Sequence, residues 1–202
     1  MSLASAASPL IAGAILAGGL SRRMGGGDKG LALLQGRPLM SHVAEALRPQ
    51  VSRLILNAND DGVRFAGFGL PVVPDSLPGF PGPLAGVLAA LEYFSGQDEA
   101  LVMIAPCDAP RLPADLVARL DAERAAAGAA GALALSAGRR HPAVALWPVA
   151  LAPALRVALV EEDQRRVDTL LRRFGFVEVE WPAEPFDPFV NVNTPEALAA
   201  LA

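Results

Sequence analysis

The sequence predicts a single α/β domain, a Rossmann-like and mostly parallel β-sheet with helices on both faces. Short apolar segments alternate with segments of helical periodicity along the first two-thirds of the chain, as in β-α-β units. Polar residues follow several of the apolar segments, and ligands of such sheets bind at the carboxyl ends of the strands. The 202 residues suffice for one sizeable core and are a tight fit for two domains.

Short apolar runs mark the expected strands. Residues 11–16 carry no charge and suit a buried parallel strand. The run at 100–105 is similar and is followed by Pro106, which lacks a backbone donor. Residues 138–142 separate two later runs and indicate a turn. The expected strands cover residues 11–16, 53–57, 70–73, 100–105, 133–136, 143–147 and 177–181.

Apolar spacing and helix-start signals mark the expected helices. Pro38 and Pro113 open two of them, since proline suits the first helical turn. Thr194 is a suitable N-cap for the last one. The expected helices cover residues 39–47, 84–94, 114–127, 150–159, 166–174 and 195–202. We expect residues 1–10 to be a flexible tail and residues 11–202 to form the domain.

Composition excludes several classes of protein. The net charge of -4 and the isoelectric point near 5.2 give no sign of the basic face that binds nucleic acid. One cysteine and two histidines cannot form an intramolecular disulfide or a four-ligand Cys/His zinc site. Glycines interrupt the apolar run at residues 10–20, so it is neither a signal peptide nor a membrane span. We therefore expect a cytoplasmic protein.

A glycine-rich segment at residues 16–29, LAGGLSRRMGGGDK, follows the first expected strand. Glycines let backbone amides approach phosphate oxygens, and Arg23 and Lys29 add positive charge. The segment is not a P-loop, because no G-K-[ST] ends it, and it is not G-x-G-x-x-G. It predicts a phosphate-binding loop of another kind.

This segment resembles the signature L-A-G-G-x-S-x-R-M-G-x-x-D-K of the molybdenum cofactor guanylyltransferases, and every fixed position matches. The resemblance continues over about residues 11–202. Its further motifs, N-A-N, D-S, G-P-L-A-G, P-C-D-x-P, H-P and N-x-N-T-P, lie at residues 57–59, 75–76, 82–86, 106–110, 141–142 and 191–195. The chain departs from the family at Asp60–Asp61, where relatives often carry a basic residue, and in its glycine-heavy residues 25–27.

The resemblance implies a fold like that of the nucleotide-diphospho-sugar transferases and a Mg²⁺-dependent transfer of GMP from GTP to molybdenum-molybdopterin. The N-terminal part would bind the nucleotide and the C-terminal part the molybdopterin. It also implies transient contacts with other cofactor-biosynthesis proteins and with molybdoenzymes. No nucleic acid or membrane partner is expected.

Residue roles follow from the same resemblance. Asp108 would bind the metal, and a carboxylate just after an apolar strand suits Mg²⁺. Lys29, Asp108 and Arg23 would be the catalytic groups. The expected nucleotide-binding residues are Leu16, Ala17, Gly18, Gly19, Lys29, Asn57, Asp75, Gly82 and Asp108. The candidates for the molybdopterin side are Arg139, Arg140, His141, Arg166, Asn191 and Asn193.

Structural roles compete with several of these assignments. Asn57 could simply end a strand, Asp75 could belong to a turn, and His141 before a proline is as suited to structure as to catalysis. Asn191 and Asn193 before Thr-Pro are also good turn and capping residues. For the arginines, an exposed, solvated charge is the competing interpretation.

Two alternative functions stay open at this point. The first is the same fold with another substrate, a molybdopterin cytidylyltransferase or a sugar-phosphate nucleotidylyltransferase. Asp28 before Lys29 and the G-P-L-A-G stretch argue against it. The second is a non-catalytic nucleotide-binding chaperone of molybdoenzymes, which the intact Asp108, Lys29 and Asn193 argue against.

Overall fold

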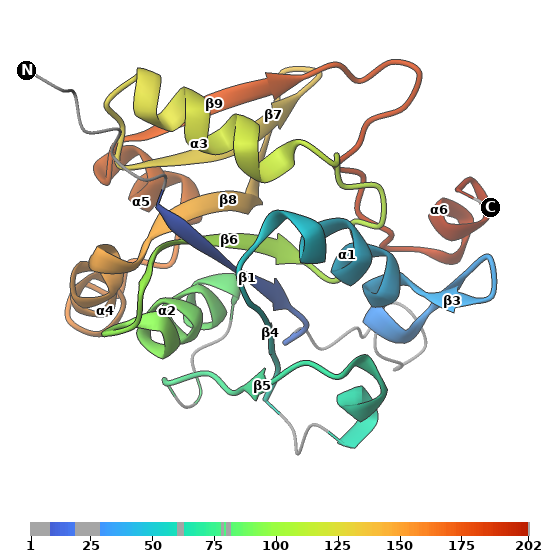
Figure 1. Ribbon diagram of the computed structural model, residues 1–202, viewed down its shortest axis with the longest axis horizontal. Coiled ribbons are helices and arrows are strands. Elements are labelled where there is room, and N and C mark those ends of the chain that lie inside the picture. The colour runs from blue at the N-terminus through green and yellow to red at the C-terminus, as the bar shows by residue number, and fades with distance from the viewer. Residues whose placement is uncertain (1–8, 19–28, 60–62, 78, 80–81, 202) are drawn as a thin grey trace, which may run out of the picture.

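The computed structural model describes residues 9–18, 29–59, 63–77, 79 and 82–201. Within them, seven strands form one sheet in the order β5-β4-β1-β6-β8-β7-β9 (Figure 1). Six of these strands run parallel, and β8 runs antiparallel to its neighbours β6 and β7. The strands are β1 (Leu10–Leu16), β4 (Leu54–Asn57), β5 (Val72–Val73), β6 (Glu99–Pro106), β7 (Gly131–Ser136), β8 (Arg139–Pro148) and β9 (Phe176–Trp181). The expected mostly parallel α/β fold is confirmed.

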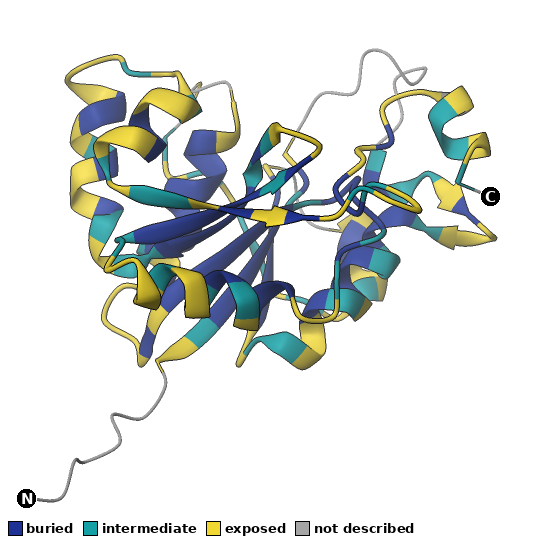
Figure 2. Cartoon of the chain, turned by 90° about the horizontal axis from the view of Figure 1, so that it is seen from above, coloured by how far each residue is buried: buried dark blue, intermediate teal, exposed yellow. Residues whose placement is uncertain are grey.

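Helices cover both faces of the sheet, as expected. The helices are α1 (Leu39–Leu47), α2 (Pro83–Phe94), α3 (Leu116–Ala126), α4 (Ala152–Val160), α5 (Val167–Arg173) and α6 (Pro195–Ala199). One apolar core lies between the sheet and α1 and α3, and a second lies between the sheet and α2, α4 and α5. Figure 2 shows the strands as a buried layer, with exposed residues on the outer sides of the helices.

The turn expected at residues 138–142 is much shorter than predicted. Ala137 and Gly138, with φ of 46° and 70°, are the two residues between β7 and β8. His141 and Pro142 therefore lie inside β8, where His141 pairs with Ala134. The register shifts next to that pair, and such a bulge accommodates Pro142, which has no backbone N–H to donate.

Other differences from the predicted elements concern boundaries. β1 begins at Leu10, within the segment expected to be tail, and residues 1–8 lie outside the described part. β5 is only two residues long because Pro71 cannot donate to β4, although its carbonyl accepts from Leu56 N at 2.9 Å. The pattern also missed the small antiparallel hairpin β2 (Leu33–Leu34) and β3 (Arg37–Pro38).

The topology brings polar residues together at one edge of the sheet. The parallel strands β1, β4, β5 and β6 all end there, and the hairpin between β7 and β8 turns at the same edge. The segment after β9 returns to this edge before α6, whose N-cap Thr194 accepts a hydrogen bond from Ala197 N at 3.2 Å. In the described ranges, no helix combines the length and apolarity needed to cross a membrane.

Candidate active site at the carboxyl edge of the sheet

The glycine-rich segment begins where β1 ends, and backbone hydrogen bonds fix that point. Ala17 N donates to Asn57 O at 2.9 Å, and Cys107 N donates to Leu16 O at 3.1 Å. The start of the loop is thereby held between the ends of β4 and β6, as a phosphate-binding turn of an α/β sheet requires. Two of the expected site residues lie outside the described part of the chain, Gly19 and Arg23.

Three side chains from distant parts of the sequence meet beside the ends of β1 and β6. Lys29 Nζ donates to Asn193 Oδ1 at 2.5 Å and lies 3.7 Å from Asp108 Oδ2. Val192 N donates to the backbone carbonyl of Asp108 at 2.9 Å, which fixes Asn193 next to this acid. The two expected catalytic groups within the described residues are therefore neighbours.

Asp108 is buried and its charge is incompletely balanced. Burial raises the pKa of its carboxyl group, and the nearby Lys29 ammonium opposes that shift only in part. Among the residues that the structure describes, no three His, Cys, Asp or Glu side chains gather into a metal site. One buried carboxylate fits Mg²⁺, which takes its other ligands from water and substrate phosphates. Asp108 has the chemistry of such a ligand.

A second polar group joins the ends of β4 and β5. Asn57 Nδ2 donates to Asp75 Oδ1 at 2.9 Å and to Val73 O at 3.1 Å. Asn59 Nδ2 donates to Asp75 Oδ2 at 2.6 Å, while Asn59 Oδ1 accepts from Asp75 N at 2.8 Å. Two amides thus fix the Asp75 carboxylate, and each of its oxygens keeps a lone pair for a further donor. Asn57 and Asp75, each expected to bind the nucleotide, are therefore hydrogen-bonded to each other.

The first turn of α2 lies directly against Asn57. A Cβ atom at Gly86 would lie 2.2 Å from Asn57 Oδ1 and 3.0 Å from Leu16 Cδ2, so this approach requires glycine. Gly82, just before α2, has a φ of 124° and no heavy atom within 4 Å of where a Cβ would be. Gly82 therefore shapes the turn into α2, and its contact with a nucleotide stays a prediction.

The candidates for the second substrate are dispersed. Arg140 forms an ion pair with Glu178 on β9, Arg166 is the exposed N-cap residue of α5, and Arg139 and Asn191 are exposed. The sixth candidate, His141, is buried. Of these six residues, Asn193 is the one with a described contact to Lys29. Their roles toward a pterin stay predictions.

The sequence analysis missed three residues at this edge. Asn59 lies in the N-A-N motif, and that position was a signal for its contact with Asp75. Ser136 and Asp187 bond to each other at 2.8 Å across 51 positions of sequence, and no local pattern announces such a pair.

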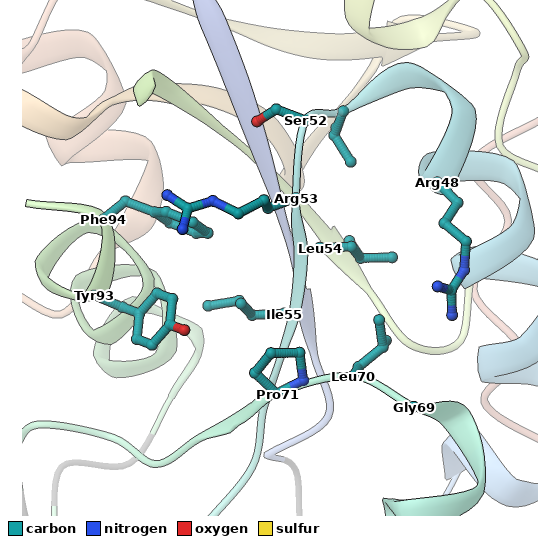
Figure 3. Close-up of a pocket in the computed structure, with 11 residues that line it drawn as sticks. Arg48, Ser52, Arg53, Leu54, Ile55, Gly69, Leu70, Pro71, Tyr93 and Phe94 are labelled. Atoms are coloured by element: carbon teal, nitrogen blue, oxygen red, sulfur yellow. The ribbon is translucent and has the colours of Figure 1, made fainter. Parts of the chain in front are cut away.

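A separate cavity lies near the start of β4, away from the carboxyl edge (Figure 3). Its volume is about 290 Å³, and Leu70, Pro71 and the side chains of α2's last turn contribute much of its wall. Arg53 lines it, but this guanidinium is already hydrogen-bonded to Glu99 and lies 5.4 Å from the centre of the Phe94 ring. The cavity therefore lies apart from the groups at the carboxyl edge.

Comparison with known proteins agrees with the geometry. The sequence model of the MobA-like NTP transferase domain matches residues 13–176. A molybdenum cofactor guanylyltransferase from Rhodopseudomonas palustris (strain BisB5) is 52% identical over 193 residues, which cover 95% of this chain and 92% of that protein. One from Bradyrhizobium sp. (strain ORS 278) is 49% identical over 200 residues, 98% of this chain and 94% of that protein.

A solved structure supports the fold. Molybdopterin-guanine dinucleotide biosynthesis protein A from Archaeoglobus fulgidus superposes with a TM-score of 0.74 at 24% identity, covering 94% of this chain and 96% of that one. At this identity the likeness concerns architecture alone. Sequence identity near 50% over almost the whole length shows the family as well as the fold. The chain belongs to the molybdenum cofactor guanylyltransferase family, within the MobA-like NTP transferases.

Proposed function

We propose that the protein transfers GMP from GTP to molybdenum-molybdopterin, giving molybdopterin guanine dinucleotide and pyrophosphate. The observation that carries the proposal is the meeting of Lys29, Asp108 and Asn193 at the carboxyl edge, beside the Asn57–Asp75 pair. The names of relatives at about 50% identity support the same reaction. A cytoplasmic location and transient contacts with molybdoenzymes belong to this proposal.

In this reaction the terminal phosphate oxygen of molybdopterin attacks the α-phosphorus of GTP. The bond between the α-phosphorus and the bridging oxygen breaks, and pyrophosphate leaves with the electron pair. Such a step needs alignment and charge stabilisation and no protein nucleophile. Lys29 is the group that would neutralise the triphosphate, and Asn193, by accepting from Nζ, holds the ammonium in place.

Asp108 would hold Mg²⁺ together with phosphate oxygens of GTP. When bound there, Mg²⁺ offsets the negative charge that accumulates on the departing pyrophosphate. The same ion would supply the positive charge that buried Asp108 lacks, since Lys29 at 3.7 Å balances it only in part. The metal and the acid would therefore stabilise each other.

Base selection would depend on Asp75. Guanine presents two adjacent donors, N1–H and N2–H, which a carboxylate can accept and which cytosine does not present in this arrangement. Asn57 and Asn59 already fix this carboxylate. We predict that Asp75→Asn lowers the preference for GTP over CTP by about tenfold or more, because an amide places a donor against the guanine donors. Competition between the two nucleotides measures this preference.

The test of the proposed function uses purified protein, α-labelled GTP, molybdenum-molybdopterin and Mg²⁺. We expect labelled dinucleotide and an equal amount of pyrophosphate with GTP, and much less product with CTP. Product from CTP at the same rate would favour the cytidylyltransferase alternative. GTP binding without pyrophosphate release would favour the non-catalytic alternative, and chelation of Mg²⁺ should stop the reaction.

A further inference from the structure

Three polar side chains meet inside the protein near the hairpin between β7 and β8. Ser136 Oγ donates to Asp187 Oδ1 at 2.8 Å and lies 2.7 Å from His141 Nε2. A serine hydroxyl has one hydrogen, which goes to Asp187, so His141 must be the donor in the second contact. Ser136 is fully buried and His141 is 8% exposed. We call these residues the Ser136 cluster.

The Ser136 cluster fixes residues 187–189, which lie in the segment between β9 and α6. Asp187 Oδ1 also accepts from Phe189 N at 2.9 Å, so two donors converge on this oxygen. The buried Phe189 ring lies between two others, 5.0 Å from His141 and 5.3 Å from Trp181 between ring centres. Polar and aromatic contacts together determine where residues 187–189 lie.

Three residues further on, the same segment enters the candidate active site. Val192 is fully buried and its N–H donates to the Asp108 carbonyl at 2.9 Å. The next residue, Asn193, accepts from Lys29 Nζ at 2.5 Å. Since Asp187 and Val192 are both fixed, little freedom is left for where Asn193 presents its amide oxygen. A shift at the Ser136 cluster would be passed to Lys29 through this short stretch of backbone.

We propose that Ser136 and Asp187 are positioning residues, which hold residues 187–193 so that Asn193 orients Lys29 beside Asp108. They act without touching the substrate. The inference rests on the proposed function, because it assigns their effect to the rate of GMP transfer. A merely structural role would destabilise the fold and leave the chemistry of the folded fraction unchanged.

A double-mutant cycle in the full-length protein tests the coupling. We expect Asp187→Ala and Asn193→Ala each to lower kcat by about tenfold or more with smaller changes in the KM for GTP, because misplaced groups lose catalysis steeply. If Asp187 acts through Asn193, the double variant is hardly slower than Asn193→Ala alone. If the fold-reductions in kcat of the two single variants multiply in the double variant, the proposal is wrong. Asp187→Asn, which keeps an acceptor oxygen for Ser136 and Phe189, should recover most of kcat.

A second readout does not depend on activity. Amide hydrogen exchange at Val192 should speed up about tenfold or more in Ser136→Ala, because the segment is released. Ser52→Ala is the matched control, since Ser52 Oγ also donates to a carboxylate, Glu99, but at the amino end of the sheet. Unchanged exchange at Val192 in Ser136→Ala, or equal acceleration in Ser52→Ala, would refute the proposal. If the wild type transfers no GMP, the proposed function fails, and exchange still decides whether the cluster holds the segment.

Discussion

The two ends of β6 each carry a buried acid, and the two acids have different partners. Glu99, the first residue of the strand, is 5% exposed, and Asp108, just beyond its end, is 7% exposed. Glu99 accepts from Arg53 Nε at 2.7 Å, from Arg53 Nη2 at 2.5 Å and from Ser52 Oγ at 3.1 Å. Asp108 has Lys29 at 3.7 Å.

Their pKa values move in opposite directions. The hydrogen bonds from Arg53 lower the pKa of Glu99, whereas burial raises the pKa of Asp108 in spite of Lys29. At Glu99 the hydrogen bonds from Arg53 outweigh the effect of burial, and at Asp108 the effect of burial outweighs that of Lys29. At the amino end Arg53 supplies the counter-charge of the acid, and at the carboxyl end Lys29 balances the acid only in part. An incompletely balanced acid beside a lysine is a mark of a functional site.

The sharpest test replaces the acid at the carboxyl end. Asp108→Asn should lower GMP transfer by about 10²-fold or more, since the proposed Mg²⁺ would lose its carboxylate ligand. The same change should raise the melting temperature of the ligand-free protein by roughly 2–4 °C, because a buried and poorly balanced charge disappears. Rate assays and thermal unfolding measure the two effects. Near-normal transfer would remove Asp108 from the mechanism.

The lysine should matter for rate and little for stability. We expect Lys29→Gln to lower kcat by roughly 10²-fold, because the triphosphate loses its positive partner. Lys29→Arg is the control that keeps the positive charge and changes its geometry. Its kcat should lie between that of the wild type and that of Lys29→Gln. A Lys29→Gln enzyme as fast as Lys29→Arg would show that charge at this position is unimportant.

Replacing the acid at the amino end, Glu99, should have an effect on stability opposite to that of Asp108→Asn. Glu99→Gln should destabilise the protein by about 1–3 kcal/mol, because it breaks a charged hydrogen-bonded pair, and should leave kcat unchanged. Urea unfolding and the transfer assay check the two outcomes. The comparison breaks down if the two carboxylate-to-amide changes shift stability in the same direction.

The smallest effect concerns pH. Burial lowers the pKa of His141 below its ordinary value of 6.5, while Asp187 raises it and Arg139 lowers it further. The unfolded chain then takes up a proton before the folded one does, so stability falls as the pH drops below 6.5. His141→Gln, which keeps a donor for Ser136, should lose less stability than the wild type between about pH 7 and pH 5. Identical pH profiles from urea unfolding would contradict this assignment.

Much of the fold and the centre of the site could be predicted. Uncharged runs such as residues 11–16 and 100–105 announce buried parallel strands, whose ends share an edge by topology. That rule alone brings the residues after β1 and β6 together. The family resemblance added the expected roles of Lys29 and Asp108 in GMP transfer, which the glycine-rich segment by itself does not give.

The second half of the sheet was harder to predict. Arg139 to His141 look like part of a turn because Gly138 precedes them and Pro142 follows. The bulge beside Ala134 lets β8 include both His141 and Pro142, and a bulge depends on the partner strand. The bond between Ser136 and Asp187 is likewise set by tertiary structure. Local patterns of hydrophobicity carry no information about such pairs.

Two kinds of connection leave the carboxyl edge, and the hairpin between β7 and β8 is the shorter kind. After β1 and β6 the chain goes on to α1 and α3, which pack against the core, so altering those connections would disturb core helices. Next to Ser136, a two-residue tip at Ala137 and Gly138 carries the chain straight back. Tips of this kind tolerate insertions. Lengthening this one would let a relative reshape its side of the carboxyl edge while the ends of β1 and β4 stay as they are.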